Sequence, residues 1–272
     1  MVKEFYEFKD ESLNFHYTRE EKPNPKDSGF TVHTHLFNEL YYFISGKVVY
    51  KIEGTTYPLH PGDILIMRHA ESHSLEIDPS EPYERISLRF DSEIIRLIDP
   101  SMRLLHAFLD RKLGENNLFT PSDFPTPLCE MLAEGMMEKT ENPRQQILSM
   151  LIPMLNELSS AYENKQNNPD YSDAPERRII DYINRHLSED ISLDRICERF
   201  YISKPHLCRI FRAATGSTVW EYVTIKRLMA ARELISKGTP PTKASAQCGF
   251  NDYSVFYRAY KRRFGVSPKK KD

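Results

Sequence analysis

A helical motif occurs twice near the C-terminal end of the chain, and this repeat limits the fold more than any other feature. The segments IFRAATG at 210–216 and AYKRRFG at 259–265 end two similar stretches that lie about fifty residues apart. Each stretch has apolar residues at helical spacing and ends at a glycine, which commonly terminates a helix. The repeat therefore predicts two copies of one helical unit.

The first copy reads as two short helices joined by a tight turn at Tyr201-Ile202. Ser192 is expected to cap the helix LDRICERF, and Ser203 the helix KPHLCRIFRAAT, which ends at Gly216. A serine hydroxyl suits this position because it accepts a hydrogen bond from a free amide of the first turn. Pro205 lies in that first turn, where a missing N–H costs little. Two such helices form a helix-turn-helix unit.

The second copy follows a long helix that we expect at Val219 to Ser236. A short helix over Thr239 to Cys248, a turn at Gly249-Phe250 and a helix over Asp252 to Phe264 complete the repeat. The C-terminal region is therefore predicted to be all-α, with two helix-turn-helix units joined by a long helix.

The charges of the chain are divided unevenly between its two parts. Residues 174–272 hold 20 Lys and Arg against 10 Asp and Glu, a balance of +10, whereas residues 1–173 hold 17 against 29, a balance of −12. This asymmetry indicates a basic module that meets a polyanion, joined to an acidic module with another task. Chance segregation of surface charge is the alternative.

The basic residues of the second helix in each unit favour DNA as that polyanion. An α-helix fits the major groove, and residues near its N-terminus then reach base edges. Arg212, Lys261 and Arg262 are expected to contact phosphate, and for any single arginine a solvated surface charge is the alternative. The predicted DNA-binding residues are Ser203, Lys204, His206, Arg209, Arg212, Asp252, Tyr253, Ser254, Tyr257, Arg258, Lys261 and Arg262.

The N-terminal part has a different periodicity. Short runs of β-branched and aromatic residues from Phe30 to Phe90 are broken by turn signals at 45–46, 53–54, 61–62 and 78–79, which is typical of an all-β sandwich or barrel. Helical spacing follows, and Pro153 should kink the last of these helices. We expect a barrel at 1–90, a helical extension at 91–160, a linker at 161–175 and the helical domain at 176–272. The extension either forms a dimer interface or covers the barrel.

The cysteines and the N-terminal segment exclude several classes of protein. Cys129, Cys197, Cys208 and Cys248 lie far apart without a C-x-x-C pair, so we expect reduced core thiols and neither a zinc knuckle nor a disulfide framework. The first residues lack the apolar run of a signal peptide, and no stretch is long and apolar enough for a membrane span. We expect a cytoplasmic protein without membrane contact.

The C-terminal region resembles the AraC/XylS family of transcriptional regulators. The resemblance rests on SKPHLCRIFRAATG, on Tyr222, Arg227 and Ala231 in the long helix, and on CGFNDYSVFYRAYKRRFGVSP, and it spans roughly residues 176–268. It implies two helix-turn-helix subdomains that insert into successive major grooves on one face of double-stranded DNA.

A histidine-rich segment of the N-terminal part resembles the first cupin motif. His33, His35 and Glu39, followed by Gly46, match its spacing, and Pro61-Gly62-Asp63 with His73 resembles the second motif. Residues two apart on a strand share a face, so the first three and Tyr41 should point into the barrel. The predicted effector-binding residues are His33, His35, Glu39, Tyr41 and His73. In metal cupins the residues matching His33, His35, Glu39 and His73 bind one divalent ion, which is the alternative here.

These features predict an α+β protein of two domains, a cupin-like barrel with appended helices and an all-α double helix-turn-helix domain. We expect a non-enzymatic, DNA-binding transcriptional regulator, without catalytic residues or a cofactor, controlled by a sugar or similar polar effector in the barrel. A homodimer is expected, with RNA polymerase as a further partner. The alternatives are a metal-dependent cupin enzyme with a DNA-binding tail and a constitutive DNA-binding protein whose barrel serves only dimerisation.

Overall fold

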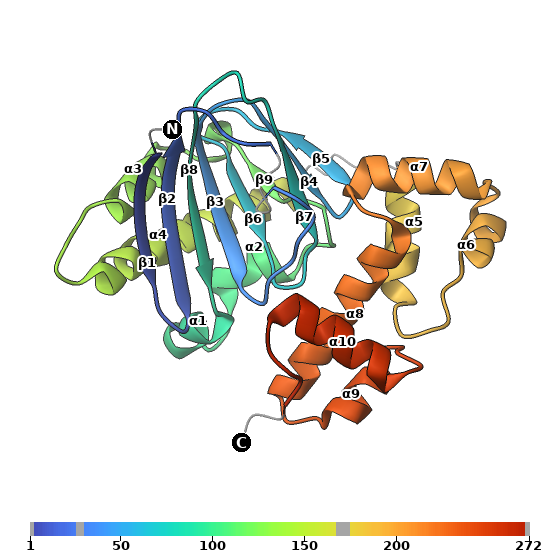
Figure 1. Cartoon of the computed structure of the whole chain (residues 1–272). Coiled ribbons are helices and arrows are strands. Elements are labelled where there is room, and N and C mark those ends of the chain that lie inside the picture. Colours follow the sequence, from blue (N-terminus) through green and yellow to red (C-terminus); the bar gives the residue numbers. More distant parts are fainter. Residues whose placement is uncertain (1–2, 26–29, 167–174, 270–272) are drawn as a thin grey trace.

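The computed structural model describes residues 3–25, 30–166 and 175–269 (Figure 1). A β-sheet domain with appended helices comes first, and an all-helical domain follows it, which confirms the predicted α+β class. Within these ranges no helix has the length and apolar character that crossing a membrane requires.

The strands of the N-terminal domain form two antiparallel sheets. In the described part of the chain the larger sheet has the order β1-β2-β8-β3-β6-β9 and the smaller has the order β5-β4-β7. The strands are β1 (Lys3–Lys9), β2 (Leu13–Glu20), β3 (Asn38–Ser45), β4 (Val48–Ile52), β5 (Thr55–Pro58), β6 (Ile64–Met67), β7 (His73–Ile77), β8 (Tyr83–Phe90) and β9 (Leu118–Phe119). Closure of these sheets into the expected barrel is not shown. The first two strands precede the segment in which we predicted the sheet.

Strand β3 shows how the larger sheet is covered on both faces. Leu40 and Tyr42 pack in a cluster with the appended helices, whereas Tyr41 and Phe43 pack in a second cluster with Tyr50 of the smaller sheet. Because successive side chains of a strand point to opposite faces, the helices lie on one face and the smaller sheet on the other. The smaller sheet therefore encloses one face of the larger sheet.

The appended helices bury their apolar stripes on the larger sheet. They are α1 (Ser92–Ile98), the 3₁₀ turn η1 (Arg103–Leu105), α2 (His106–Leu109), the 3₁₀ turn η2 (Pro121–Asp123), α3 (Leu128–Met136) and α4 (Pro143–Gln166), which contains Pro153. Leu151, Leu155 and Leu158 of α4 are fully buried in the cluster with the sheet. This stripe supports the covering role. Helix α4 extends into the predicted linker, and residues 167–174 lie outside the described residues.

The C-terminal domain consists of two small helical units on one long helix, as predicted (Figure 1). Tyr222 and Val223 of α8 pack in the core of the first unit, whereas Leu228 and Ile235 pack in the core of the second. The helices are α5 (Pro175–Arg185), α6 (Leu193–Phe200), α7 (Lys204–Thr215), α8 (Val219–Ser236), α9 (Pro241–Gln247) and α10 (Tyr253–Phe264).

The predicted helix ends of the first unit are confirmed. The Ser192 hydroxyl accepts a hydrogen bond from the backbone N–H of Arg195, and the Ser203 hydroxyl accepts one from that of His206. Gly216 ends α7 in the left-handed conformation, at φ 77°, which glycine adopts without a steric penalty. These caps determine where the second helix of the unit begins and ends.

The expectation of four core thiols is wrong in part. Cys129 and Cys248 are buried, but Cys197 is half-buried and Cys208 is exposed on α7. All four are free cysteines. Cys208 follows Leu207, which faces the core, and the next position along a helix is turned by about 100° away from it.

Candidate effector site and nucleic-acid interface

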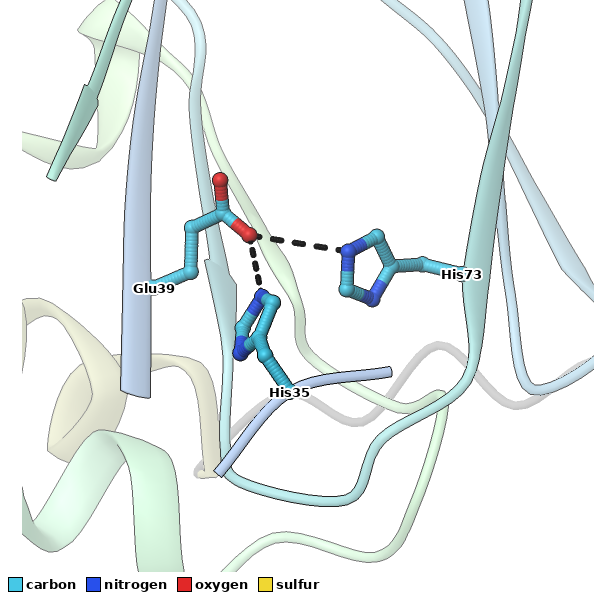
Figure 2. Close-up of side chains that lie close together, drawn as sticks. All are labelled: His35, Glu39 and His73. Carbon is cyan, nitrogen blue, oxygen red and sulfur yellow. Dashed lines mark hydrogen bonds and ion pairs between the residues drawn. The ribbon is translucent and has the colours of Figure 1, made fainter. Parts of the chain in front are cut away.

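His35, Glu39 and His73 meet between the two sheets (Figure 2). Glu39 lies on β3, His73 is the first residue of β7, and His35 lies in the segment before β3. Oε2 of Glu39 is 2.5 Å from Nε2 of His35 and 3.5 Å from Nε2 of His73. The side chains of Glu39 and His73 are 3% and 1% exposed, so both groups are withdrawn from solvent.

The expected strand across His33 and His35 is wrong. β3 begins only at Asn38, and His33 instead forms an isolated bridge with His73, each backbone N–H donating to the other's carbonyl oxygen. The ring of His33 packs edge-on against that of His73, at 4.3 Å between centroids, and it is not one of the three residues whose ligand atoms converge. Tyr41 faces the interior, but its hydroxyl is 2.7 Å from that of Tyr83.

The backbone sets the orientation of both converging imidazoles. Nδ1 of His35 is 2.8 Å from the carbonyl oxygen of Phe37, and Nδ1 of His73 is 3.0 Å from that of Glu71. A carbonyl oxygen can only accept, so each Nδ1 carries the proton. Nε2 of His35 is hydrogen-bonded to Oε2 of Glu39, so a proton lies between these two atoms, whereas Nε2 of His73 has no hydrogen-bond partner among the described residues. Nε2 of His73 is therefore the atom of the cluster that is open to a cation or a hydrogen-bond donor.

The surroundings lower the pKa values of Glu39, His33 and His35. Burial lowers the pKa of His35, although Glu39 opposes that effect. Burial also lowers the pKa of His33 to about 3, with the neighbouring His73 acting in the same direction. Burial alone would raise the pKa of Glu39, but Arg89 and His35 hold it well below its usual range. The carboxylate is therefore ionised, and burial makes His33 and His35 weaker bases than a free imidazole.

The donor set of the cluster fits a divalent transition metal ion. Two imidazole nitrogens and one carboxylate oxygen are typical ligands for zinc, iron, nickel or manganese. Both rings direct Nδ1–H at a backbone carbonyl, which is the usual support of a metal-binding histidine. Nε2 of His73 is buried and has no hydrogen-bond partner among the described residues. His35, Glu39 and His73 could therefore hold a metal, and His33 is the neighbour nearest to them in the predicted set.

Two arginines on β8, which the sequence analysis did not select, border the same site. Arg89 lies opposite Glu39 in the strand register, with Nε 3.4 Å from Oε1 of that residue. Arg85 stacks over the ring of Tyr83, and its Nη1 is buried without a hydrogen-bond partner in the described part of the chain. These donors face the smaller sheet and offer N–H groups to an anionic or hydroxyl-bearing ligand.

The predicted DNA-binding residues of the first unit lie together on the outer side of α7. Lys204 forms an exposed ion pair with Asp194 of α6 at 2.7 Å, and Nη2 of Arg209 donates to Nδ1 of His206 at 2.9 Å. Leu207 and Phe211 point into the core instead. The residues exposed on this side are Ser203, Lys204, His206, Arg209 and Arg212.

The second unit exposes its predicted residues in the same way. Asp252 caps α10, because its Oδ1 accepts hydrogen bonds from the backbone N–H groups of Ser254 and Val255, and these bonds lower its pKa. Phe256 and Tyr260 fill the core. The residues exposed on this helix and its cap are Asp252, Tyr253, Ser254, Tyr257, Arg258, Lys261 and Arg262. Both units thus present a polar, largely basic helix to solvent, as a major groove requires.

Comparisons with known proteins agree with this division of the chain. Residues 22–110 match the model of the AraC-like ligand binding domain, and residues 196–271 match that of a helix-turn-helix domain. The two domains define a helix-turn-helix transcriptional regulator with an N-terminal ligand-binding domain. The chain belongs to the AraC/XylS family of these regulators.

Two similar proteins match over most of the chain, and a third matches over about a third of it. The HTH-type transcriptional activator RhaS of Salmonella heidelberg (strain SL476) is 24% identical over 261 residues, covering 91% of this chain and 89% of RhaS. Fatty-acid-bound ToxT of Vibrio cholerae is 15% identical and covers 95% of this chain and 94% of its own, with a TM-score of 0.41. The DNA-binding domain of AdpA in complex with target DNA is 24% identical, covering 35% and 86%, with a TM-score of 0.33.

Proposed function

We propose that the protein binds a specific operator through α7 and α10 and that a small polar effector, bound between the two sheets, controls this binding. The observation that carries the proposal is the pair of helix-turn-helix units, each exposing a polar helix on one shared scaffold, α8. The N-terminal domain supplies buried polar groups at the His35, Glu39 and His73 cluster, which suits ligand recognition. The protein acts without catalysis.

A sugar or similar polar metabolite is the effector that these groups favour. Arg85 and Arg89 provide N–H donors, and Glu39 and the histidines provide acceptors, so a ligand with several hydroxyl groups would satisfy both. A thermal-shift screen of sugars, organic acids and metal ions on the full chain tests this assignment. If a compound stabilises the wild type in this screen, His33→Ala should abolish that stabilisation while DNA affinity stays unchanged. A compound that stabilises the wild type and His33→Ala equally would contradict the role of His33 in effector binding.

A divalent metal ion is a second candidate for the input. The specific observation is that one ligand atom each of His35, Glu39 and His73 lies within 4.8 Å of the others, and that Nε2 of His73 has no hydrogen-bond partner in the described part of the chain. Titration with Co²⁺, followed by its visible absorption, tests this candidate. We expect binding to the wild type and its loss in His73→Ala, with Arg89→Ala as a control that leaves all three ligands in place. Equal absorption by wild type and His73→Ala would reject a metal site.

The oligomeric state and the further partners belong to the same proposal. We infer a cytoplasmic homodimer that acts on RNA polymerase. On the appended helices α1 and α3, Leu97, Ile98 and Met131 are 87%, 54% and 62% exposed and are therefore available for self-association. Sedimentation at several protein concentrations tests the dimer, and Leu97→Glu should shift it toward monomer. We place the boundary between effector and DNA-binding domains between α4 and α5.

A further inference from the structure

Glu53 is a carboxylate of the N-terminal domain that is buried against the C-terminal domain. It lies in the turn between β4 and β5, in the left-handed conformation at φ 48°, and its side chain is fully buried. The next residue, Gly54, approaches α5 so closely that an added Cβ would lie 2.2 Å from Cδ1 of Ile180. The β4–β5 turn is therefore seated between the helices of the first DNA-binding unit (Figure 1).

Three side chains of the C-terminal domain surround this carboxylate. Nζ of Lys226 on α8 forms an ion pair with Oε1, and the Tyr222 hydroxyl of the same helix donates to Oε2. Nδ2 of Asn184 on α5 donates to Oε2 at 3.1 Å. The Lys226 side chain is only 4% exposed, so the ion pair is almost completely buried from solvent.

The same contact reaches the segment that carries His73. The backbone N–H of Ser72 donates to Oε1 of Glu53 at 2.6 Å, and the N–H of Glu53 donates to the carbonyl oxygen of Ser72 at 3.0 Å. Nζ of Lys226 also donates to the carbonyl oxygen of Ala70 at 2.8 Å. Residues 70–72 thus lie directly between the ion pair and the first residue of β7.

Residues 70–72 are also held from inside the N-terminal domain. Arg111 binds the Glu71 carboxylate through both Nη1 and Nη2, at 2.7 and 2.5 Å, and neither side chain of this pair has any solvent exposure. Ala70 adopts a left-handed conformation, at φ 61°, which is unfavourable for a residue with a Cβ. Because residues 70–72 form a short segment that is strained at Ala70 and held by contacts on both sides, a displacement of His73 also moves the groups that contact this segment.

We propose that the Glu53–Lys226 ion pair couples the site at His73 to the DNA-binding domain through residues 70–72. A ligand that moves His73 changes the hydrogen bonds of Ser72 and Ala70, and with them the position of α8, on which both helix-turn-helix units are built. Glu53 and Lys226 are positioning residues in this scheme and contact neither effector nor DNA. The inference rests on the proposed function.

The chemistry of the ion pair favours coupling over simple adhesion. A buried ion pair contributes little net stability compared with well-packed apolar side chains, because both ions lose their hydration. Removing one partner leaves an uncompensated buried charge, and the attraction between two buried charges depends strongly on their separation, so this contact responds to displacement of either domain. An adhesive interface between these domains would need only apolar contacts such as that of Gly54 with Ile180.

Hydrogen exchange on the full chain tests the contact itself. In Lys226→Met we expect exchange of the backbone amides at 70–73 and 180–184 to accelerate at least about tenfold. Lys237→Met is the matched control, because it breaks an exposed ion pair with Glu233 at the end of the same helix. The double variant Glu53→Gln/Lys226→Met leaves no unpaired charge at this contact. It replaces the single variant in the exchange experiment if Lys226→Met fails to fold. Unchanged exchange in both segments of these variants would overturn the proposal.

DNA affinity tests the coupling. In the wild-type background, His73→Ala should change the dissociation constant for the selected operator about fivefold or more. In the Glu53→Gln/Lys226→Met background the same substitution should change it by less than about twofold. Equal changes in both backgrounds, or no change in either, would overturn the coupling. Failure of the wild type to bind any DNA would instead reject the proposed function, and the exchange result would still decide the interdomain contact.

Discussion

Arg227 of α8 donates a hydrogen bond to the carbonyl oxygen of Gly249, at 2.7 Å, in the turn of the second DNA-binding unit. The same guanidinium donates to the carbonyl oxygens of Leu187 and Glu189, which follow α5 in the first unit, both at 2.7 Å. One side chain therefore connects the two units, and the spacing between α7 and α10 depends on it.

Arg227→Ala should lower the free energy of unfolding by about 1–3 kcal/mol, because it leaves three carbonyl oxygens without their charged donor. Operator binding should weaken as well, since two recognition helices must reach their grooves together. Urea unfolding and fluorescence anisotropy measure the two effects. Lys237→Ala, which removes an exposed charge from the end of the same helix, is the control. An Arg227 variant as stable as this control would refute the bridging role.

Arg209→Ala should weaken binding to the preferred operator by about 1–3 kcal/mol and relax specificity at one base pair. The reason is that a guanidinium near the N-terminal half of α7 can form a bidentate contact with guanine. Binding to a set of single-base operator variants measures it. Arg96→Ala on α1 removes an exposed charge from the N-terminal domain and controls for net charge. An unchanged preference at every position would argue against base contact by Arg209.

Lys261→Ala should weaken binding to operator and to random DNA by the same factor. A lysine in the last turn of α10 is exposed and is expected to neutralise one phosphate, so its loss should reduce the salt dependence of binding by about one counterion. Anisotropy titrations at several salt concentrations give the slope. A loss confined to the operator would mean that Lys261 reads sequence.

The local structure of the DNA-binding domain could be predicted from the sequence, because its signals are short in range. Ser203, Pro205 and Gly216 act within one helix, and each adopts its expected position in α7. By contrast, β1 and β2 were missed because their apolar residues are almost all aromatic and they lack the aliphatic, β-branched runs of the later strands.

Contacts between distant residues account for what the sequence could not predict at the effector site. Glu53 and Lys226 are 173 positions apart and belong to no motif, and Arg85 and Arg89 lie on a strand that carries other polar residues, so nothing in the sequence marks them out. His33 was expected to act with His35 because their spacing matched a motif. A backbone bridge to His73 determines its position instead, and pairing of that kind depends on the tertiary fold.

Glu71→Gln should destabilise the protein by about 3–5 kcal/mol near neutral pH, because it leaves the Arg111 guanidinium buried without a counter-charge. Burial alone would raise the pKa of Glu71, but Arg111 lowers it from 4.5 to about 2. The folded state thus has the lower pKa, so the stabilisation is complete above about pH 4.5 and is lost as the pH falls toward about 2.

Urea unfolding of wild type and Glu71→Gln over this pH range measures the difference. We expect the two unfolding free energies to converge as the pH falls. Asp78→Asn is the control, since hydrogen bonds from Ser80 and Lys47 also lower that pKa to about 2, but on an exposed turn where salt screens the charge. A constant difference between wild type and Glu71→Gln at all pH values would show that the carboxylate is not ionised in the folded protein.

Selection of binding sites from a random DNA library by the full chain tests the central claim most directly. Two recognition helices on one scaffold predict an enriched site with two short conserved elements about one helical turn, roughly 10 base pairs, apart on one face of the duplex. Arg209→Ala should degrade one element, and Tyr257→Ala should degrade the other. Recovery of no enriched sequence, or of a single element affected by both substitutions, would contradict the account.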